Sequence, residues 1–161
     1  MAKDFKQGRL PARYFLPILG LWTGCRLEEL AGLRKQDVGE QDGVPFLNIV
    51  PTPERPLKTA SARRRIPLHP EVIRLGFVRY VEACNDGERI FRDLKPGRFK
   101  KLSGPYSTAF ARLMDDVGLS DPRLTYHSLR HTYSDAMRRA GIEPELRSRL
   151  LGHAAGNITA A

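Results

Sequence analysis

At 161 residues, the chain has the size of one domain and is long enough to bury a core without disulfides or a structural metal. Its 27 Lys and Arg outnumber 18 Asp and Glu and leave a formal net charge of +9, which favours a nucleic-acid partner. A membrane partner is disfavoured, because no stretch approaches the roughly 18 apolar residues of a span and no signal-peptide pattern opens the chain.

The two cysteines are too few for a disulfide framework. Cys25 and Cys84 show no Cys-x-x-Cys or Cys/His ligand spacing, so we expect reduced thiols of an intracellular protein. Cys25 could serve as a nucleophile, but a lone cysteine is uninformative without its base. We therefore expect a small buried residue at this position.

The N-terminal part of the chain predicts a core helix. Residues 1–9 are polar and basic, and we interpret them as a frayed start or a linker stump ahead of one domain over residues 10–161. Residues 10–22 are apolar enough for a buried helix, in which Pro17 predicts a kink or an early boundary.

An arginine stands at the start of the next predicted helix. Leu27, Leu30 and Leu33 repeat at the spacing of one apolar helical stripe. Arg26 precedes this stripe after a glycine turn, and Glu29 lies one helical turn later. The arginine is therefore either solvated, as most are, or oriented by the glutamate to bind an anion.

The following segment predicts a small antiparallel sheet. Residues 45–50, 54–59 and 63–68 are typical of two or three short strands separated by glycine and proline. Lys58 lies at the end of the second of these strands, ahead of a turn.

Two basic segments are candidates for contacts to a nucleic-acid backbone. Arg63, Arg64 and Arg65 form a run at the third strand, which either binds phosphates or forms a solvated edge that blocks strand pairing. Lys100 and Lys101 belong to a basic Pro/Gly loop, and we assign them to DNA binding as well.

The C-terminal half predicts helices. Apolar periodicity indicates four of them, over residues 70–81, 107–117, 127–140 and 144–151. Gly118 and Gly152 end two of these helices in the usual C-terminal manner. The elements together predict an α+β fold, mainly α with a small antiparallel β-sheet.

The helix predicted over residues 127–140 contains the most informative side chains. A step of 100° per residue places His127, Arg130, His131 and Ser134 on one face and Leu129, Tyr133, Ala136 and Ala140 on the other. We expect the second face to pack and the first to present cations. A guanidinium beside an imidazole suits a phosphate oxygen, because both supply donors. Phosphate chemistry is the first hypothesis, although a lone His-x-x-Arg is more often structural.

Four motifs follow one another along the chain. They are Thr23-Gly-Cys-Arg26-Leu-Glu-Glu29-Leu-Ala-Gly-Leu33, Lys58-Thr59 ahead of Pro67-Leu68, His127-Ser-Leu-Arg130-His131-Thr132, and Leu150-Leu-Gly-His153. In this order and spacing they resemble the catalytic domain of tyrosine recombinases, the phage integrase family, over nearly the whole chain. The resemblance implies the fold of a DNA breaking-rejoining enzyme, and four motifs together are far more specific than any one.

The resemblance also implies a role for each matched residue. Arg26 and Arg130 match the two arginines that bind the non-bridging oxygens of the scissile phosphate and stabilise its transition state. Lys58 matches the lysine that protonates the departing 5′ oxygen, and His127 matches a general acid or base. His153 matches a second histidine that donates to the phosphate. Two supporting positions remain, Glu29 as an acidic residue that holds the site together and His131 as a structural histidine.

The family's nucleophile has no counterpart in the chain. In the family a tyrosine follows the histidine matched by His153 by about nine or ten residues, whereas the sequence ends at Ala161, and no tyrosine follows Tyr133. We interpret the five tyrosines present as packed or interfacial aromatics and expect the chain alone not to cleave DNA. Either the sequence stops one turn short of the nucleophile, or its tail has been cut away, or the nucleophile is genuinely lost.

We favour the first two explanations, because the other matched residues are retained together. The helical DNA-binding domain that usually precedes this one in relatives also has no counterpart, which indicates an excised catalytic domain. The leading hypothesis is thus a site-specific recombinase that breaks and rejoins DNA through a 3′-phosphotyrosine, with its tyrosine beyond Ala161. A type IB topoisomerase shares this chemistry. The alternative outside the enzymes is a DNA-binding module without a nucleophile. A basic helical protein that binds nucleic acid and matches the motifs by chance is a further alternative.

Partners and location follow from the same hypothesis. We expect double-stranded DNA and other recombinase protomers on DNA as partners, with the fragment itself monomeric, because the family's exchanged C-terminal segment is missing. The sequence offers no carboxylate cluster for Mg²⁺, so we expect no metal and no cofactor. A bacterial or phage-encoded protein of the cytoplasm, associated with the nucleoid, is the expected setting.

Overall fold

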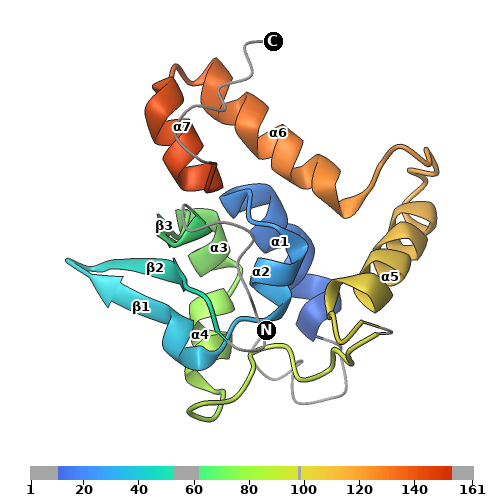
Figure 1. Ribbon diagram of the computed structural model, residues 1–161, viewed down its shortest axis with the longest axis horizontal. Coiled ribbons are helices and arrows are strands. Elements are labelled where there is room, and N and C mark those ends of the chain that lie inside the picture. Colours follow the sequence, from blue (N-terminus) through green and yellow to red (C-terminus); the bar gives the residue numbers. More distant parts are fainter. Residues whose placement is uncertain (1–10, 53–61, 98, 154–161) are drawn as a thin grey trace.

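One small sheet lies to one side of a group of helices in the computed structural model of the chain (Figure 1). The structure describes residues 11–52, 62–97 and 99–153. Their elements are α1 (Pro11–Thr23), α2 (Leu27–Ala31), the 3-10 helix η2 (Lys35–Asp37), β1 (Val38–Gln41), β2 (Val44–Ile49), β3 (Arg64–Pro67), α3 (Pro70–Arg74), α4 (Phe77–Glu82), α5 (Ser103–Asp116), α6 (Tyr126–Arg139) and α7 (Pro144–Leu151). The predicted α+β class is confirmed. Across these ranges, every helix is too short or too polar to cross a bilayer.

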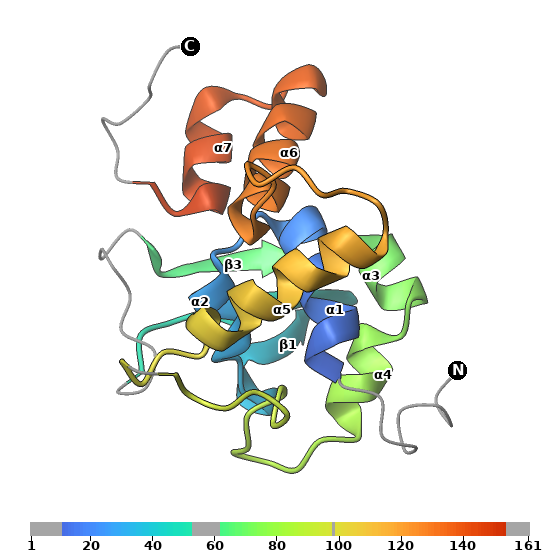
Figure 2. The same cartoon turned by 90° about the vertical axis from the view of Figure 1, so that its right-hand side faces the viewer.

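Helix α1 forms the centre of the core. It packs against α2, α3 and α6, and its Phe15, Leu16 and Leu19 have no exposed surface. Figures 1 and 2 show the sheet on one side of α1 and α2, α5 on another, and the pair α6 and α7 across one end. This arrangement brings the start of α2 and the end of α7 close together, although they are far apart in the sequence.

The sheet has the order β1-β2-β3, and both of its pairs are antiparallel. Leu47 of β2 pairs with Ile66 of β3, and both side chains are buried against the helices. Side chains alternate between the two faces of a strand, so Arg64 shares the buried face with Ile66. Arg65 lies on the other face, where its guanidinium stacks 4.9 Å from the ring centroid of Phe46.

The first strand of the sheet was missed from the sequence. The chain turns between β1 and β2 at Asp42 and Gly43, whose φ angles are both positive, at 51° and 75°. An Asp-Gly pair is a strong signal of a two-residue hairpin turn, so the sequence did contain a signal for the β1–β2 hairpin. The predicted strand over residues 54–59 lies outside the described residues, and so does Lys58.

Three helix boundaries also differ from prediction. Helix α1 continues through Pro17, so an early boundary there was wrong. The helix predicted over residues 70–81 is broken at Gly76, which has a φ of 90° and separates α3 from α4. Helix α5 begins earlier than expected because the Glu28 carboxylate accepts hydrogen bonds from the N–H groups of Leu102 and Ser103, a cap that only the tertiary structure supplies.

Gly24 occupies a turn that accepts no side chain. Its φ is 61°, and an added Cβ would lie 2.3 Å from Cδ1 of Tyr133 and 3.0 Å from Cδ2 of Leu151. We expect Gly24→Ala to lower the free energy of unfolding by about 3 kcal/mol, because backbone strain and a steric clash add. Chemical denaturation measures this loss.

Gly43→Ala is the matched control for Gly24→Ala. Gly43 also has a positive φ, 75°, but a Cβ there meets no atom within 4 Å. This variant should lose only about 1 kcal/mol, the cost of the backbone conformation. Equal losses in the two variants would show that close packing at Gly24 is unimportant.

Candidate active site

Arg26 directly precedes helix α2 as its N-cap, and both its backbone and its side chain contact Glu29. The Arg26 N–H donates to Oε2 of Glu29 at 2.8 Å, and Nη1 donates to Oε1 at 3.1 Å. The glutamate therefore satisfies one free N–H of the first helical turn and directs the arginine. The Arg26 side chain remains 31% exposed, whereas that of Glu29 is 5% exposed. The expected contact between the two is confirmed, and the guanidinium keeps donors for an anion.

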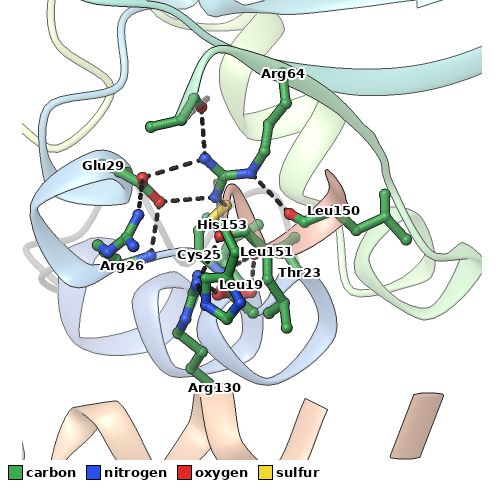
Figure 3. Close-up of polar contacts among 12 residues, drawn as sticks. Leu19, Thr23, Cys25, Arg26, Glu29, Arg64, Arg130, Leu150, Leu151 and His153 are labelled. Carbon is green, nitrogen blue, oxygen red and sulfur yellow. Dashed lines mark hydrogen bonds and ion pairs between the residues drawn. The ribbon is translucent and has the colours of Figure 1, made fainter. Parts of the chain in front are cut away.

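Arg130 of α6 reaches into the protein and joins three segments. Its Nη1 donates to the Gly24 carbonyl after α1, and its Nη2 donates to the Leu151 carbonyl at the end of α7. Nη2 also lies 3.0 Å from Nε2 of His153 (Figure 3). The Arg-plus-His pairing expected for phosphate is thus present, although the histidine is His153.

The predicted faces of α6 were partly wrong. Arg130 is 5% exposed and packs inward with Tyr126 and Met137, whereas Ala136 and Ala140 are exposed. The reason is that buried carbonyls of two other segments attract the guanidinium, and hydrophobic periodicity does not record such partners.

His153 is held at the end of α7 by the way that helix ends. Gly152 has a φ of 66°, and the His153 N–H donates to the Ser148 carbonyl at 3.0 Å. This six-to-one bond with a left-handed glycine is the Schellman form of helix end. The predicted stop at Gly152 is confirmed, and it directs the chain so that His153 meets Arg130.

His127 and His131 lie on the exposed side of α6. Their rings meet edge to face, with 4.9 Å between centroids. His131 is therefore an exposed neighbour of His127. A supporting role for His131 through this contact stays a prediction.

Burial, and after it the surrounding charges, oppose protonation of the two candidate histidines. Burial, followed by His131 and the nearby arginines, lowers the pKa of His127. Burial, followed by Arg130 and Arg26, lowers the pKa of His153. Burial and then Arg26 lower the pKa of Arg130 to about 10, so this guanidinium stays charged at neutral pH. The site is thus a cluster of positive charge with neutral imidazoles that are able to exchange protons.

Stability should depend on pH through these histidines. A histidine whose pKa is lowered by folding stabilises the native state above its unfolded pKa, and this contribution is lost as pH falls below about 6.5. We expect the free energy of unfolding to decrease between pH 7 and pH 5, and His127→Asn and His153→Asn each to reduce that slope. Denaturant titrations across this range measure it. A stability that rises on acidification would contradict the expectation.

Arg64 was assigned to DNA contact from the sequence, and the structure corrects this. Its side chain is 6% exposed and donates to both carboxylate oxygens of Glu29, at 2.9 Å and 3.2 Å. Its position two residues before Ile66 on the buried face of β3 is the signal that alternation offered. The alternative prediction, that all three arginines form a solvated strand edge, is also wrong for Arg64, because its side chain is buried.

The other candidate DNA-binding residues are accessible. The exposed ones are Arg63, Arg65, Lys100 and Lys101. Arg65 donates to Gln41 of β1, across the intervening strand β2, at 3.1 Å. Their contact with DNA stays a prediction, as does the role of Lys58 outside the described residues.

Cys25 is buried at 1% exposure, and burial raises the pKa of its thiol, so the expected small core residue is confirmed. Tyr126 and Tyr106 are buried as well, and burial raises the pKa of both phenols. The Tyr80 hydroxyl donates to the Ile90 carbonyl. These tyrosines are packed aromatics rather than exposed nucleophiles. Among the described residues, no three His, Cys, Asp or Glu side chains gather as metal ligands would.

Comparison with known proteins decides the family. The model of the phage integrase family matches residues 6–161. The chain belongs to the phage integrase family. No curated protein matches the chain in sequence.

Solved structures share the fold of this integrase-family chain. A variant Tn1549 transposon integrase with a circular intermediate DNA is 26% identical, with a TM-score of 0.65 over 93% of this chain and 54% of that one. XerH recombinase bound to difH substrate is 18% identical, with a TM-score of 0.61 over 94% and 43%. XerA recombinase is 20% identical, with a TM-score of 0.61 over 89% and 50%.

The integrase-family chain therefore has the catalytic-domain fold of tyrosine recombinases. It spans about half the length of the solved structures it matches.

Proposed function

We propose that this chain is the catalytic domain of a site-specific DNA recombinase. The observation that supports it best is the contact of Arg130 with His153 beside Arg26, which brings together two guanidinium groups and an imidazole from the start of α2, from α6 and from the end of α7. A phosphodiester in reaction gains charge on its non-bridging oxygens, and donors aimed there stabilise the transition state. The related integrase and XerH structures contain DNA, which also supports a DNA substrate.

The proposed reaction is a transesterification. A tyrosine oxygen attacks the scissile phosphorus, a bond to the tyrosine forms, and the bond to the 5′ oxygen breaks. Arg26, Arg130 and His153 bind the non-bridging oxygens. His127 takes the tyrosine proton, and Lys58 gives a proton to the departing 5′ oxygen. Rejoining reverses these steps, so the reaction needs no external energy source and no cofactor.

The attacking tyrosine in this proposal follows Ala161 in a longer protein. Double-stranded DNA is the partner, contacted by Arg63, Arg65, Lys100 and Lys101, whose charges are accessible. Other protomers assemble on the same DNA, and the isolated chain is monomeric. The bacterial cytoplasm, at the nucleoid, is the proposed location.

A covalent adduct is the test of this function. The full-length gene product is incubated with a pool of nicked duplexes of randomised sequence, and SDS-resistant complexes are isolated and sequenced. We expect adducts on a restricted set of sequences, lost when the tyrosine after Ala161 is changed to phenylalanine. Sequence-specific binding without any adduct would replace the proposal by a DNA-binding module. Relaxation of supercoiled plasmid without sequence preference would favour a type IB topoisomerase.

A further inference from the structure

One buried arginine lies between the two ends of the candidate site. Arg26 with Glu29 forms one end, and His153 after α7 forms the other. We infer that Arg64 is a positioning residue that holds Arg26 and His153 at a fixed separation. Its effect on DNA cleavage rests on the proposed function, whereas its effect on the geometry does not.

At the first end, Arg64 acts through a shared carboxylate. Glu29 binds Arg64 with both oxygens, at 2.9 Å and 3.2 Å, and the same two oxygens accept from Arg26. All these groups are visible in Figure 3, where the carboxylate of Glu29 lies between the two guanidinium groups. A shift of Arg64 therefore moves Glu29, and a shift of Glu29 turns the Arg26 side chain.

At the second end, Arg64 binds the last turn of α7. Its Nε donates to the Leu150 carbonyl at 2.7 Å, while Arg130 binds the next carbonyl, that of Leu151. The last carbonyls of a helix have no partner within the helix, so two arginines on consecutive carbonyls fix where the helix ends. His153 follows two residues after Leu151 and takes its position from this end.

The packing around the guanidinium leaves little freedom. Besides Glu29 and Leu150, the guanidinium has two further acceptors. Nη1 donates to the Ala62 carbonyl at 2.7 Å, and Nη2 donates to Sγ of Cys25 at 3.5 Å. A Cβ on Gly152 would lie 2.8 Å from Nη1 of Arg64, which shows how closely the end of α7 rests on it. A lysine retains the charge but has no planar fork and no Nε donor, so it cannot bind all of these partners.

Arg64→Lys in the full-length protein tests the inference. The matched control is Arg74→Lys, at an exposed arginine of α3 that pairs with Glu71 and has no role in the proposed site. The first readout needs no DNA and follows the NMR signals of the Arg26 and His153 amides and the titration of the His153 ring. The second is the cleavage rate on nicked duplex at saturating protein, together with the affinity for that duplex. Arg64→Met, which removes the charge, is a second variant for the ring titration.

We expect Arg64→Lys to shift both amides and to slow cleavage by about 100-fold, because small misplacements of reacting groups have effects of this size, with affinity changed less than threefold. Arg64→Met should raise the pKa of His153, and Arg74→Lys should alter none of these readouts. Unchanged Arg26 and His153 signals, or cleavage by Arg64→Lys within threefold of wild type, would overturn the inference. A wild-type protein that forms no adduct would refute the proposed function, and the DNA-free signals would still decide whether Arg64 joins the two ends.

Discussion

Arg130→Lys should reduce the rate of DNA strand cleavage by about 10³-fold, since arginines that stabilise a phosphoryl transition state have effects of this order. The guanidinium contacts His153 and also binds the carbonyls of Gly24 and Leu151. A lysine provides one charged group for these separate partners, so it leaves at least one buried carbonyl unpaired. We therefore also expect a loss of about 2 kcal/mol in the free energy of unfolding. Single-turnover cleavage and denaturant unfolding measure the two effects.

Arg138→Lys on the same helix is the control for Arg130→Lys. Arg138 is exposed, and its one described partner is Asp135 at 3.5 Å. The Arg138→Lys variant should cleave DNA at a rate within threefold of wild type, and it should unfold at the same denaturant concentration as wild type. If Arg130→Lys cleaved within tenfold of wild type, the proposed binding of the phosphate by Arg130 would be wrong.

Glu29→Gln should be the most destabilising change of a single charge in the site. The carboxylate is 5% exposed and binds Arg64, whose side chain is 6% exposed. Removing one partner of a buried ion pair leaves the other charge uncompensated, which costs about 3 to 5 kcal/mol. Glutamine keeps the volume, so the loss reports on charge rather than on packing. Denaturant unfolding at pH 7 measures it.

The acid dependence of Glu29→Gln provides an internal check. Burial opposes ionisation of Glu29, but hydrogen bonds and charge from Arg64 and then Arg26 outweigh it and lower the pKa of this carboxyl below its ordinary value of 4.5. The stability that depends on this charge is present above that pH and is lost on acidification. The difference between Glu29→Gln and wild type should therefore shrink as pH falls below about 4.5.

Glu28→Gln is the neighbouring control for Glu29→Gln. Glu28 accepts from the N–H groups of Leu102 and Ser103 and contacts no arginine in any described hydrogen bond or ion pair. Its amide oxygen can still accept from one of these two N–H groups, so we expect a loss of about 1 kcal/mol. Equal losses for the two variants would show that the Glu29 ion pair adds nothing.

Motif residues and helix ends could be predicted because their causes are local. The four motifs led to the family, and apolar spacing predicted α7 with its stop at Gly152. The pairing of Arg26 with Glu29 was also predictable, since residues three apart meet on one helical turn. Helices α3 and α4 were predicted as one, because the apolar pattern runs on past the turn at Gly76.

The partners of Arg64 and Arg130 could not be predicted, because they are carbonyls and a carboxylate from distant segments. Leu150 is 86 residues from Arg64, and Gly24 is 106 residues from Arg130. A run of three arginines predicts exposed charge, yet strand alternation and Glu29 bring the middle one inside.

The sequence by itself determined the family, the α+β class and the residues proposed to bind phosphate, because residue type and spacing along the chain carry that information. Only the tertiary structure decided which of these side chains contact one another. The contact of Arg130 with His153, and the placement of Arg64 between Glu29 and the end of α7, depend on how α1, β3, α6 and α7 pack together. Buried polar groups must find partners wherever the fold places them, and that requirement has no local signature in the chain.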